Sequence, residues 1–234
     1  MGNETMDLEQ LAAYLQRDVR EVNKLVSRGN LPGRKVGGQW RFARAEIIHW
    51  LETQLPDYDE QQLSALESTA TAPAKLDDQV VAPLLSVDSI AVPLKATTTN
   101  SVLRAMVQQA EQTWQVYDPE AILEAVRQRE EIQSTALPGG VAIPHPHRPM
   151  PAALGETVIA YGRTLSGIHF GGDRELTDLF FLVCSHDDRS HLRILARLAR
   201  LFLRPGFLDS LRAAETPLDS WQVIDSAERE LAAG

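Results

Sequence analysis

Three histidines stand at places where side chains of α/β proteins often do chemistry. His145 and His147 follow a short apolar run, residues 141–143, that reads as a strand and ends in a proline. His191 lies in the first turn of an expected helix, directly after the most apolar strand-like run, with His186 in the loop before it. Ligand sites of α/β sheets collect beyond strand ends, so these imidazoles could share one site. There they could bind a metal, act as a base, carry a charged group or remain ordinary surface residues.

A metal site needs more ligands than the sequence offers. His145 and His147 have the H-x-H spacing of metal ligands and His191 could join them, but no acid or cysteine is obviously placed to complete the set. The single cysteine, Cys184, lies inside an apolar run and is expected to be a buried small hydrophobe. The chain has no glycine-rich phosphate loop and no Gly-x-Ser-x-Gly elbow. We therefore expect neither a metal nor a cofactor.

Composition indicates a globular protein large enough for one large domain or two modest ones. The 234 residues are 44% hydrophobic and 24% charged, which is ordinary for a soluble chain. No apolar stretch approaches the roughly 20 residues that cross a bilayer, and the N-terminal residues have neither the basic nor the apolar region of a signal peptide. The chain is therefore expected to be cytoplasmic, with no membrane partner.

The net charge of −9 is distributed unevenly along the chain. Residues 1–55 contain eight Lys and Arg against seven Asp and Glu, a balance of +1, whereas the remainder contains 15 against 25, a balance of −10. Residues 28–45 carry five basic side chains and no acid. A solvated basic face is the simplest explanation, but a basic stretch that coincides with a small recognisable fold favours a polyanionic partner.

The N-terminal residues predict two short helices in close succession. Asp7 with Gln10, and Asp18 with Glu21, have the spacing of capping boxes and mark two helix starts. Apolar residues follow each start at helical intervals, and Gly29 is expected to end the second helix. Two short amphipathic helices joined in this way predict a helix-turn-helix.

A basic hairpin and a third helix are expected next. Gly37 and Gly38 separate two strand-like runs, and both can take the positive φ values of a two-residue turn. Three apolar residues of one parity are expected to cover the helices: Val36, Trp40 and Phe42. Two bases of the other parity are expected to face outward: Lys35 and Arg41. A helix-turn-helix followed by a basic wing places a recognition helix in the major groove of DNA and the wing on the adjacent backbone.

Residues 7–51 are similar to the excisionase-type, MerR-like DNA-binding modules. The resemblance rests on G-x-L-P after the second helix, K-V-G-G-x-W-R-F in the wing and W-L at the end of the third helix. It implies duplex DNA as a partner, contacted through six side chains: Arg20, Asn23 and Lys24 on the second helix, then Lys35, Arg41 and Arg44. One small module makes few contacts, so tight specific binding would need a homodimer. A basic module used for protein contacts is the alternative.

The remaining residues predict a linker and a larger domain. Residues 56–83 lose apolar periodicity and are expected to be a linker, with a short helix over residues 59–66 as an option and a flexible stretch over residues 67–75. Residues 84–234 alternate strand-like and helix-like segments. The expected fold class is therefore α/β, a mixed sheet with flanking helices, preceded by a small winged helix-turn-helix domain over residues 1–55.

Residues 86–226 resemble the IIA domains of the bacterial sugar phosphotransferase system, of the fructose/mannitol and nitrogen-regulatory kind. The resemblance rests on REEIQSTALPGGVAIPHPHRP, residues 129–149, followed by SHLRILARLARLF. It implies that His145 accepts a phosphoryl group from a phosphohistidine on an HPr-type phosphocarrier, with His191 as the second active-site histidine and Arg129 as a cation near the phosphoryl group. Such a domain is a phosphoryl carrier rather than a turnover enzyme.

The chemistry of these residues fits those roles. A neutral imidazole nitrogen is a competent nucleophile near pH 7, and its phosphoramidate can pass the group on. Phosphoryl transfer mainly requires positioning and compensation of charge on the phosphoryl oxygens, which a guanidinium and a second imidazole provide. Ser134 and Thr135 could add donors near the phosphate.

His147 departs from the pattern of the family. It stands where a permanent cation, Arg or Lys, would be expected, so it is interpreted as a phosphate-neighbouring or partner-facing cation that weakens above neutral pH, beside Arg148. His49 and His169 are expected to be ordinary residues.

Three functions remain open from the sequence. The first is a regulatory protein that couples phosphorylation of His145 to DNA binding, because about −1.5 to −2 added charges would alter an interdomain or partner contact. The acidic C-terminal domain could dock on the basic wing before phosphorylation. The alternatives are a non-phosphorylated IIA-fold scaffold that acts through protein contacts and a IIA component of sugar transport.

Overall fold

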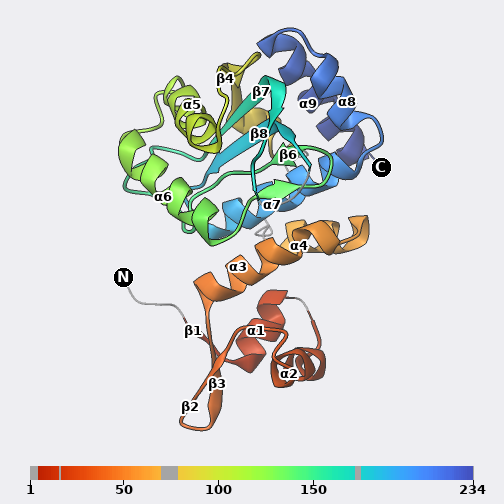
Figure 1. Cartoon of the computed structure of the whole chain (residues 1–234). Coiled ribbons are helices and arrows are strands. Elements are labelled where there is room, and N and C mark those ends of the chain that lie inside the picture. Colours follow the sequence, from red (N-terminus) through yellow and green to blue (C-terminus); the bar gives the residue numbers. More distant parts are fainter. Residues whose placement is uncertain (1–4, 16, 70–78, 172–174, 234) are drawn as a thin grey trace.

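The first part of the chain forms a small helical module with a β-hairpin (Figure 1). The computed structural model describes residues 5–15, 17–69, 79–171 and 175–233. The elements of the module in chain order are β1 (Thr5–Met6), α1 (Leu8–Leu15), α2 (Val19–Ser27), β2 (Arg34–Val36), β3 (Gln39–Ala43) and α3 (Arg44–Gln54). The three strands form an antiparallel sheet in the order β1-β3-β2. This confirms the predicted helix-turn-helix followed by a hairpin and a third helix.

The helix starts follow the predicted capping residues. The Asp7 carboxylate accepts a hydrogen bond from the Gln10 backbone at 2.8 Å, and the Gln10 side chain accepts one from the Asp7 backbone at 2.9 Å, so α1 begins with a reciprocal capping box. Asp18 caps α2 by accepting from the Arg20 backbone at 2.7 Å. Its expected partner Glu21 turns outward instead and forms an ion pair with Arg17 at 3.4 Å.

The hairpin has the predicted turn but a different distribution of faces. Its register pairs Lys35 with Trp40 and Val36 with Gln39. Cross-strand partners share a face, so a two-residue turn puts residues of opposite parity on the same side. The ammonium group of Lys35 accordingly lies 5.1 Å from the centre of the Trp40 ring, and Val36 is 60% exposed. The prediction that Val36 covers the helices was therefore wrong, whereas Phe42 is fully buried.

The larger part of the chain is built on a five-stranded mixed sheet in the order β4-β7-β8-β6-β5. The strands are β4 (Leu85–Ala91), β5 (Ala136–Leu137), β6 (Val141–Ala142), β7 (Val158–Ile168) and β8 (Thr177–Cys184). β8 is parallel to β6 and antiparallel to β7, and β4 is parallel to β7. The predicted α/β fold with a mixed sheet is confirmed, including the central place of the most apolar strand.

Helices cover both faces of this sheet. They are α5 (Thr99–Glu111), α6 (Pro119–Ile132), α7 (Asp188–Leu203), α8 (Phe207–Ala213) and α9 (Pro217–Ala233). Alternate residues of β8 point to opposite sides: Phe180 and Leu182 join the apolar cluster under α5 and α6, whereas Phe181 and Val183 join the cluster that includes α7, α8 and α9. A strand buried on both faces must be apolar throughout, which explains the continuous run.

Some helix bounds differ from the expected ones. The α5 helix ends at Glu111 rather than near residue 116. The α8 helix begins after Gly206, whose φ of +79° suits its left-handed position, and not at Pro205. The α9 helix, expected to be short, runs for 17 residues from Pro217 to Ala233.

The first half of the predicted linker is a docked helix. After a short 3-10 turn η1 (Leu55–Asp57), residues Glu60–Thr69 form α4, which packs along α7. Glu67, expected to begin a flexible stretch, is buried there and accepts hydrogen bonds from Arg197 at 3.0 Å. Residues 70–75 of that stretch lie outside the described residues. A second 3-10 turn, η2 (Ala82–Leu84), leads into β4.

The helix-turn-helix module rests on the larger domain through α3 and α4. These helices lie between the rest of the module and α7, while the β2–β3 hairpin lies at the far end of the module (Figure 1). The buried residues of the module belong to the same contiguous apolar cluster as those of α7. Within the described part of the chain, no helix combines the length and apolar character needed to cross a membrane.

Candidate active site

The backbone fixes the orientation of the His145 ring. His145 follows β6, where the Pro144 carbonyl accepts a hydrogen bond from the Val183 backbone at 3.0 Å. Its Nδ1 lies 2.7 Å from the carbonyl oxygen of Ile143. A carbonyl oxygen only accepts, so Nδ1 must carry a proton and Nε2 holds the lone pair of the neutral ring. Nε2 is therefore the nitrogen that can act as a nucleophile, although the side chain is only 4% exposed.

His191 reaches the same site from α7, the helix that follows β8. Asp187 caps α7 by accepting from the backbone of Arg189 and Ser190 at 2.9 and 3.0 Å, which places His191 in the first turn. The two imidazole centres of His191 and His145 are 5.0 Å apart. The Ser185 hydroxyl lies 3.2 Å from His191 Nδ1 and can donate to it, which leaves Nε2 as a donor.

Arg129 supplies a buried cation. It lies in the last turn of α6, is 4% exposed and donates from Nη1 to the carbonyl of Gln133 at 2.8 Å. Its Nη2 points into the site and lies 3.3 Å from a carboxylate oxygen of Glu52. The three residues implied by the resemblance, His145, His191 and Arg129, are thus brought together by three different segments of the domain.

Glu52, a residue of the helix-turn-helix module, completes this cluster. Its carboxylate oxygen Oε1 accepts from His191 Nε2 at 2.9 Å, and Oε2 lies 3.3 Å from His145 Nε2. His49, one turn earlier on α3, contributes Nδ1 at 3.3 Å from Oε2. The Glu52 side chain is only 2% exposed. The sequence analysis did not identify Glu52 and took His49 for an ordinary residue. The signal that could have indicated Glu52 was its position one helical turn after Ile48, which is buried.

The pKa values of the cluster reflect this close packing. Burial raises the pKa of the Glu52 carboxyl, but the neighbouring imidazoles of His145, His191 and His49 outweigh burial and hold that pKa well below its usual range. Burial is the main cause that lowers the pKa of His145, and the Glu52 carboxylate only partly offsets it. Near neutral pH the Glu52 carboxyl is therefore ionised.

The other predicted neighbours of the phosphate have different partners. Ser134 and Thr135 direct their hydroxyls to the Glu130 carboxylate, at 2.8 and 2.6 Å. Arg148 is exposed. His147 is half-buried against α3, with its ring 5.2 Å from that of His49 in an edge-on arrangement. Burial, and then the charge of His49, lowers the pKa of His147, so this ring is a weak cation at neutral pH.

The cluster also contains a set of possible metal ligands. The nearest ligand atoms of Glu52, His145 and His191 all lie within 4.8 Å of one another. Glu52 is the acid that the sequence analysis did not identify. In this ligand set it stands in place of His147, which the sequence had suggested. The Arg129 guanidinium, 3.3 Å from the same carboxylate, already compensates its charge. A buried guanidinium at this position favours an anion over a cation.

The candidate DNA-contacting residues fall into two groups. Arg20, Asn23 and Lys24 are exposed on α2, and Lys35 is exposed on the hairpin. Arg41 is half-buried and donates from Nη2 to the Gln39 side chain at 3.1 Å.

Arg44, in contrast, contacts the larger domain. Its Nε lies 3.2 Å from an Asp188 carboxylate oxygen, and its guanidinium lies 5.2 Å from the centre of the Tyr14 ring. The expectation that the acidic domain docks on the wing is therefore corrected, because docking occurs through α3 and the hairpin points away (Figure 1).

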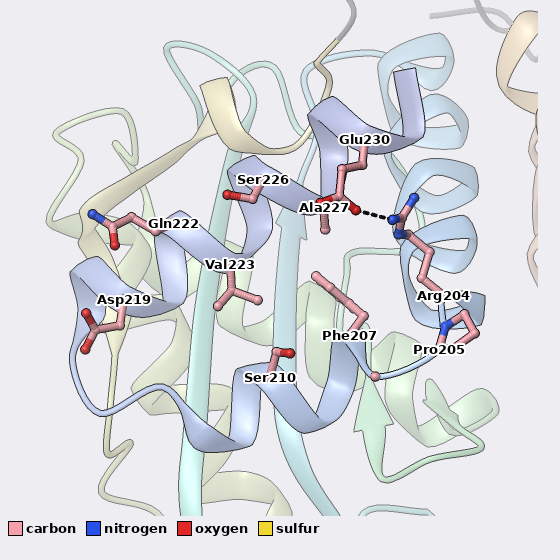
Figure 2. A pocket seen from close by; sticks show the side chains of 11 residues that line it. Arg204, Pro205, Phe207, Ser210, Asp219, Gln222, Val223, Ser226, Ala227 and Glu230 are labelled. Atoms are coloured by element: carbon pink, nitrogen blue, oxygen red, sulfur yellow. Dashed lines mark hydrogen bonds and ion pairs between the residues drawn. The ribbon is translucent and has the colours of Figure 1, made fainter. Parts of the chain in front are cut away.

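A surface pocket lies elsewhere on the domain, between the end of α7, α8 and α9 (Figure 2). Phe207 and Val223 form its apolar wall, and an ion pair between Arg204 and Glu230 lies at its rim. None of its lining residues belongs to the histidine cluster.

Comparison with known proteins identifies both parts of the chain. Residues 83–227 match the family described as the phosphoenolpyruvate-dependent sugar phosphotransferase system, EIIA 2, and residues 5–55 match a helix-turn-helix domain. Over 148 residues the chain is 31% identical to a nitrogen regulatory protein of Bradyrhizobium diazoefficiens, covering 62% of this chain and 94% of that protein. Over 139 residues it is 27% identical to the fructose-specific EIIABC component of Bacillus subtilis, covering 58% of this chain. The match spans only 21% of that component.

Solved structures share the fold of the larger domain. The nitrogen regulatory protein IIA-Ntr of Neisseria meningitidis superposes with a TM-score of 0.55 at 20% identity, covering 61% of this chain and 97% of that chain. The mannitol IIA protein of Escherichia coli superposes with a TM-score of 0.54 at 18% identity, covering 59% and 97%. The chain therefore belongs to the EIIA 2 family of the phosphoenolpyruvate-dependent sugar phosphotransferase system, and it carries a helix-turn-helix domain ahead of its EIIA 2 residues.

Proposed function

We propose that this protein is a regulatory phosphoryl acceptor that couples phosphorylation of His145 to DNA binding. The observation that carries the proposal is the bond from His145 Nδ1 to the Ile143 carbonyl, which leaves Nε2 as the nucleophile beside His191 and Arg129. The donor is a phosphohistidine on an HPr-type phosphocarrier. The Nε2 lone pair attacks phosphorus, the phosphorus–nitrogen bond to the donor ring breaks, and the donor ring takes that electron pair.

Arg129 and His191 compensate the charge that the transfer brings into the site. A phosphohistidine at this position adds about −1.5 to −2 charges, by analogy with other phosphorylated side chains. The Arg129 guanidinium and the His191 Nε2–H are donors already aimed at an anion, because both contact the Glu52 carboxylate. Preoriented donors of this kind are the main requirement for phosphoryl transfer.

The helix-turn-helix domain supplies the second half of the function. Arg20, Asn23 and Lys24 are exposed on α2, where a recognition helix presents its side chains to the major groove. Lys35 stands on the exposed hairpin, where a wing contacts the phosphate backbone. This arrangement supports duplex DNA as the partner and regulation, rather than sugar transport, as the role.

Phosphotransfer to the full chain tests the first half. The chain is incubated with a phosphocarrier charged from phosphoenolpyruvate, and acid-labile phosphate is located by mass spectrometry. Wild type and the exposed control His169→Ala should be labelled once, and His145→Ala should stay unlabelled. Absence of label both on wild type and on Glu52→Gln, which removes the carboxylate charge from the site, would instead support a IIA-fold scaffold, a role that the carboxylate already seated in the site also fits.

Salt-dependent DNA binding tests the second half. Removing one cationic side chain that binds a DNA phosphate reduces the slope of log affinity against log salt by about 0.9 for duplex DNA. Arg41→Ala should therefore give a slope shallower by about one, whereas Arg104→Ala, on α5 of the other domain, should leave it unchanged. A homodimer would be seen as a doubled mass at the concentrations where binding is tight. No binding at low salt would leave the module as a protein adaptor.

A further inference from the structure

We propose that Glu52 is an internal substitute for the phosphoryl group, by which the helix-turn-helix domain closes the acceptor site. This inference rests on the proposed function of His145 and names the regulation of that site. The α3 helix delivers the Glu52 carboxylate to the donors that a phosphoryl group would need. Closure by Glu52 and phosphorylation of His145 are therefore mutually exclusive states.

The first support is the identity of the contacts. The Glu52 carboxylate accepts from His191 Nε2 at 2.9 Å and lies 3.3 Å from Arg129 Nη2. These are the imidazole and the guanidinium that compensate an anion in the site. A carboxylate and a phosphoryl group are both oxyanions that accept charge-assisted hydrogen bonds from a guanidinium, so one can occupy the subsite of the other.

The second support is steric. Oε2 of Glu52 lies 3.3 Å from His145 Nε2, the nitrogen that must bond to phosphorus. A phosphorus atom one bond length from Nε2, with its three oxygens, would overlap the carboxylate at this distance. Two anions held this closely in a site that excludes water would also repel each other strongly. Phosphorylated His145 therefore cannot coexist with Glu52 in its present position.

The third support is access. The side chains of His145, His191 and Glu52 are 4%, 5% and 2% exposed, so the cluster is covered. A phosphocarrier must bring its own phosphohistidine to Nε2 in line with the bond that forms. Nε2 of His145 faces the Glu52 carboxylate of α3 at 3.3 Å. The closed form can neither receive a phosphoryl group nor keep one.

The contacts that α3 and α4 make with the larger domain differ in a way that suits reversible closure. Around the site, α3 is held by Glu52, by the edge-on contact of His49 with His147, and by the partly exposed ion pair of Arg44 with Asp188. The following helix α4 is held on α7 by the buried pair of Glu67 and Arg197. We expect α3 to leave the site while α4 stays docked, so that the module remains attached close by.

A consequence follows from the reciprocity of coupled equilibria. If closure prevents phosphorylation, phosphorylation must prevent closure to the same degree. Any ligand that binds the open form better also promotes phosphorylation. Duplex DNA is such a ligand if it draws Arg44 away from Asp188, whose carboxylate oxygen lies 3.2 Å from the Arg44 Nε in the closed form.

The rate of phosphotransfer to the full chain tests the proposal. Glu52→Gln keeps the shape of the side chain but removes the charge that pairs with Arg129, and it should be labelled at His145 at least ten-fold faster than wild type. Glu46→Gln, on the same helix but paired with Arg34 inside the module, is the matched control and should behave as wild type. An equal or lower rate for Glu52→Gln would overturn the proposal.

A second measurement does not depend on phosphotransfer. Diethylpyrocarbonate acylates accessible unprotonated imidazole nitrogens, and the exposed His169 and His186 serve as internal references. His145 should react at least ten-fold faster in Glu52→Gln than in wild type, and Glu52→Asp, which withdraws the carboxylate by one methylene, should be intermediate. A chelator in every reaction ensures that no bound cation causes the protection. Equal reactivity of His145 in all variants would exclude closure by Glu52.

The two measurements separate the possible failures. If no variant is phosphorylated but Glu52→Gln exposes His145, the proposed function fails and closure stands. If wild type is phosphorylated, and Glu52→Gln is neither faster nor more reactive, closure fails and the function stands. Circular dichroism of each variant shows whether it is folded, and Glu52→Asp replaces Glu52→Gln if the latter is not.

Discussion

Two buried glutamates, Glu52 and Glu67, join the N-terminal segments to the EIIA domain, and their partners differ. Glu67 of α4 is held by two arginines: Arg197 donates from Nε at 3.0 Å and Arg200 from Nη1 at 2.8 Å. Glu52 of α3 is held by imidazoles and by one guanidinium. Both carboxylates therefore cross the boundary between the two parts of the protein, but only Glu52 enters the cluster of His145 and His191.

The difference separates a permanent contact from a reversible one. An arginine stays protonated at all relevant pH values and offers no nucleophile, so the Glu67 contact has a single state. Burial raises the pKa of Glu67, but Arg197 and Arg200 outweigh it and keep that pKa low. A histidine can change its charge or be phosphorylated, so the Glu52 contact can be broken by chemistry at its partner.

A buried network reinforces the permanent contact. Arg197 also donates to Glu228 of α9 at 3.0 Å, and the Glu228 carboxylate accepts from the backbone of Val80, Val81 and Ala82 at 2.6 to 2.9 Å. The same carboxylate thus positions the segment that enters β4. We infer that α4, α7, α9 and the start of the sheet form one unit, against which α3 can move.

The largest expected effect is that of breaking the permanent contact. Glu67→Gln removes the carboxylate that Arg197 and Arg200 share, so buried Arg197 is left with Glu228 and half-buried Arg200 with the exposed Glu60. Removal of one member of a buried pair typically costs about 3–5 kcal/mol. The free energy of unfolding from urea denaturation should fall by that amount. Glu60→Gln, which removes an exposed partner of Arg200, should cost about 0.2–1 kcal/mol. Equal losses in the two variants would contradict the comparison.

Acidification should affect the reversible contact first. The folded protein lowers the pKa of His145 and His147, so below the unfolded value of about 6.5 the unfolded chain binds more protons and stability falls as pH falls. The slope is at most about 1.4 kcal/mol per pH unit for each ring, and less for the partly exposed His147. The low pKa values of Glu52 and Glu67 add a further loss only below about pH 4.3.

Free energies of unfolding measured from pH 7.5 to pH 4 check this order. His147→Asn should flatten the curve between pH 7 and pH 5, whereas the exposed control His169→Asn should not change it. A curve that is level down to pH 5 in wild type would show that the histidines do not set the stability of this region.

The smallest expected effect is at the edge of the reversible contact. Arg44 and Asp188 are 24% and 34% exposed, and exposed pairs contribute about 0.2–1 kcal/mol. Asp188→Asn should therefore raise the phosphotransfer rate by no more than about five-fold, and high salt should remove the difference. Asp209→Asn, on the far helix α8, is the matched control. An increase as large as that of Glu52→Gln would assign the closure to Arg44 instead.

Local features of the fold were predictable because their causes are local. The box of Asp7 and Gln10 starts α1, Asp118 caps α6 by accepting from the Ala121 backbone at 3.0 Å, and the two glycines turn the hairpin. Each depends on residues within one helical turn or one tight turn. The prediction for Val36 failed for an equally local reason. Across a two-residue turn, residues of opposite parity share a face, so Val36 lies on the face of its partner Gln39 and not on the face of Phe42.

The tertiary structure alone decided what fills the site. Residue type and position beside predicted strand and helix ends pointed to His145, His147 and His191, and the family resemblance then favoured His145 and added Arg129. Glu52 stands 93 residues before His145 and on a helix that serves the other domain. Its role depends on which face of α3 meets the larger domain, and that is settled by the packing of whole surfaces. A local pattern can offer imidazoles as candidates for chemistry, but only docking shows that a carboxylate covers one of them.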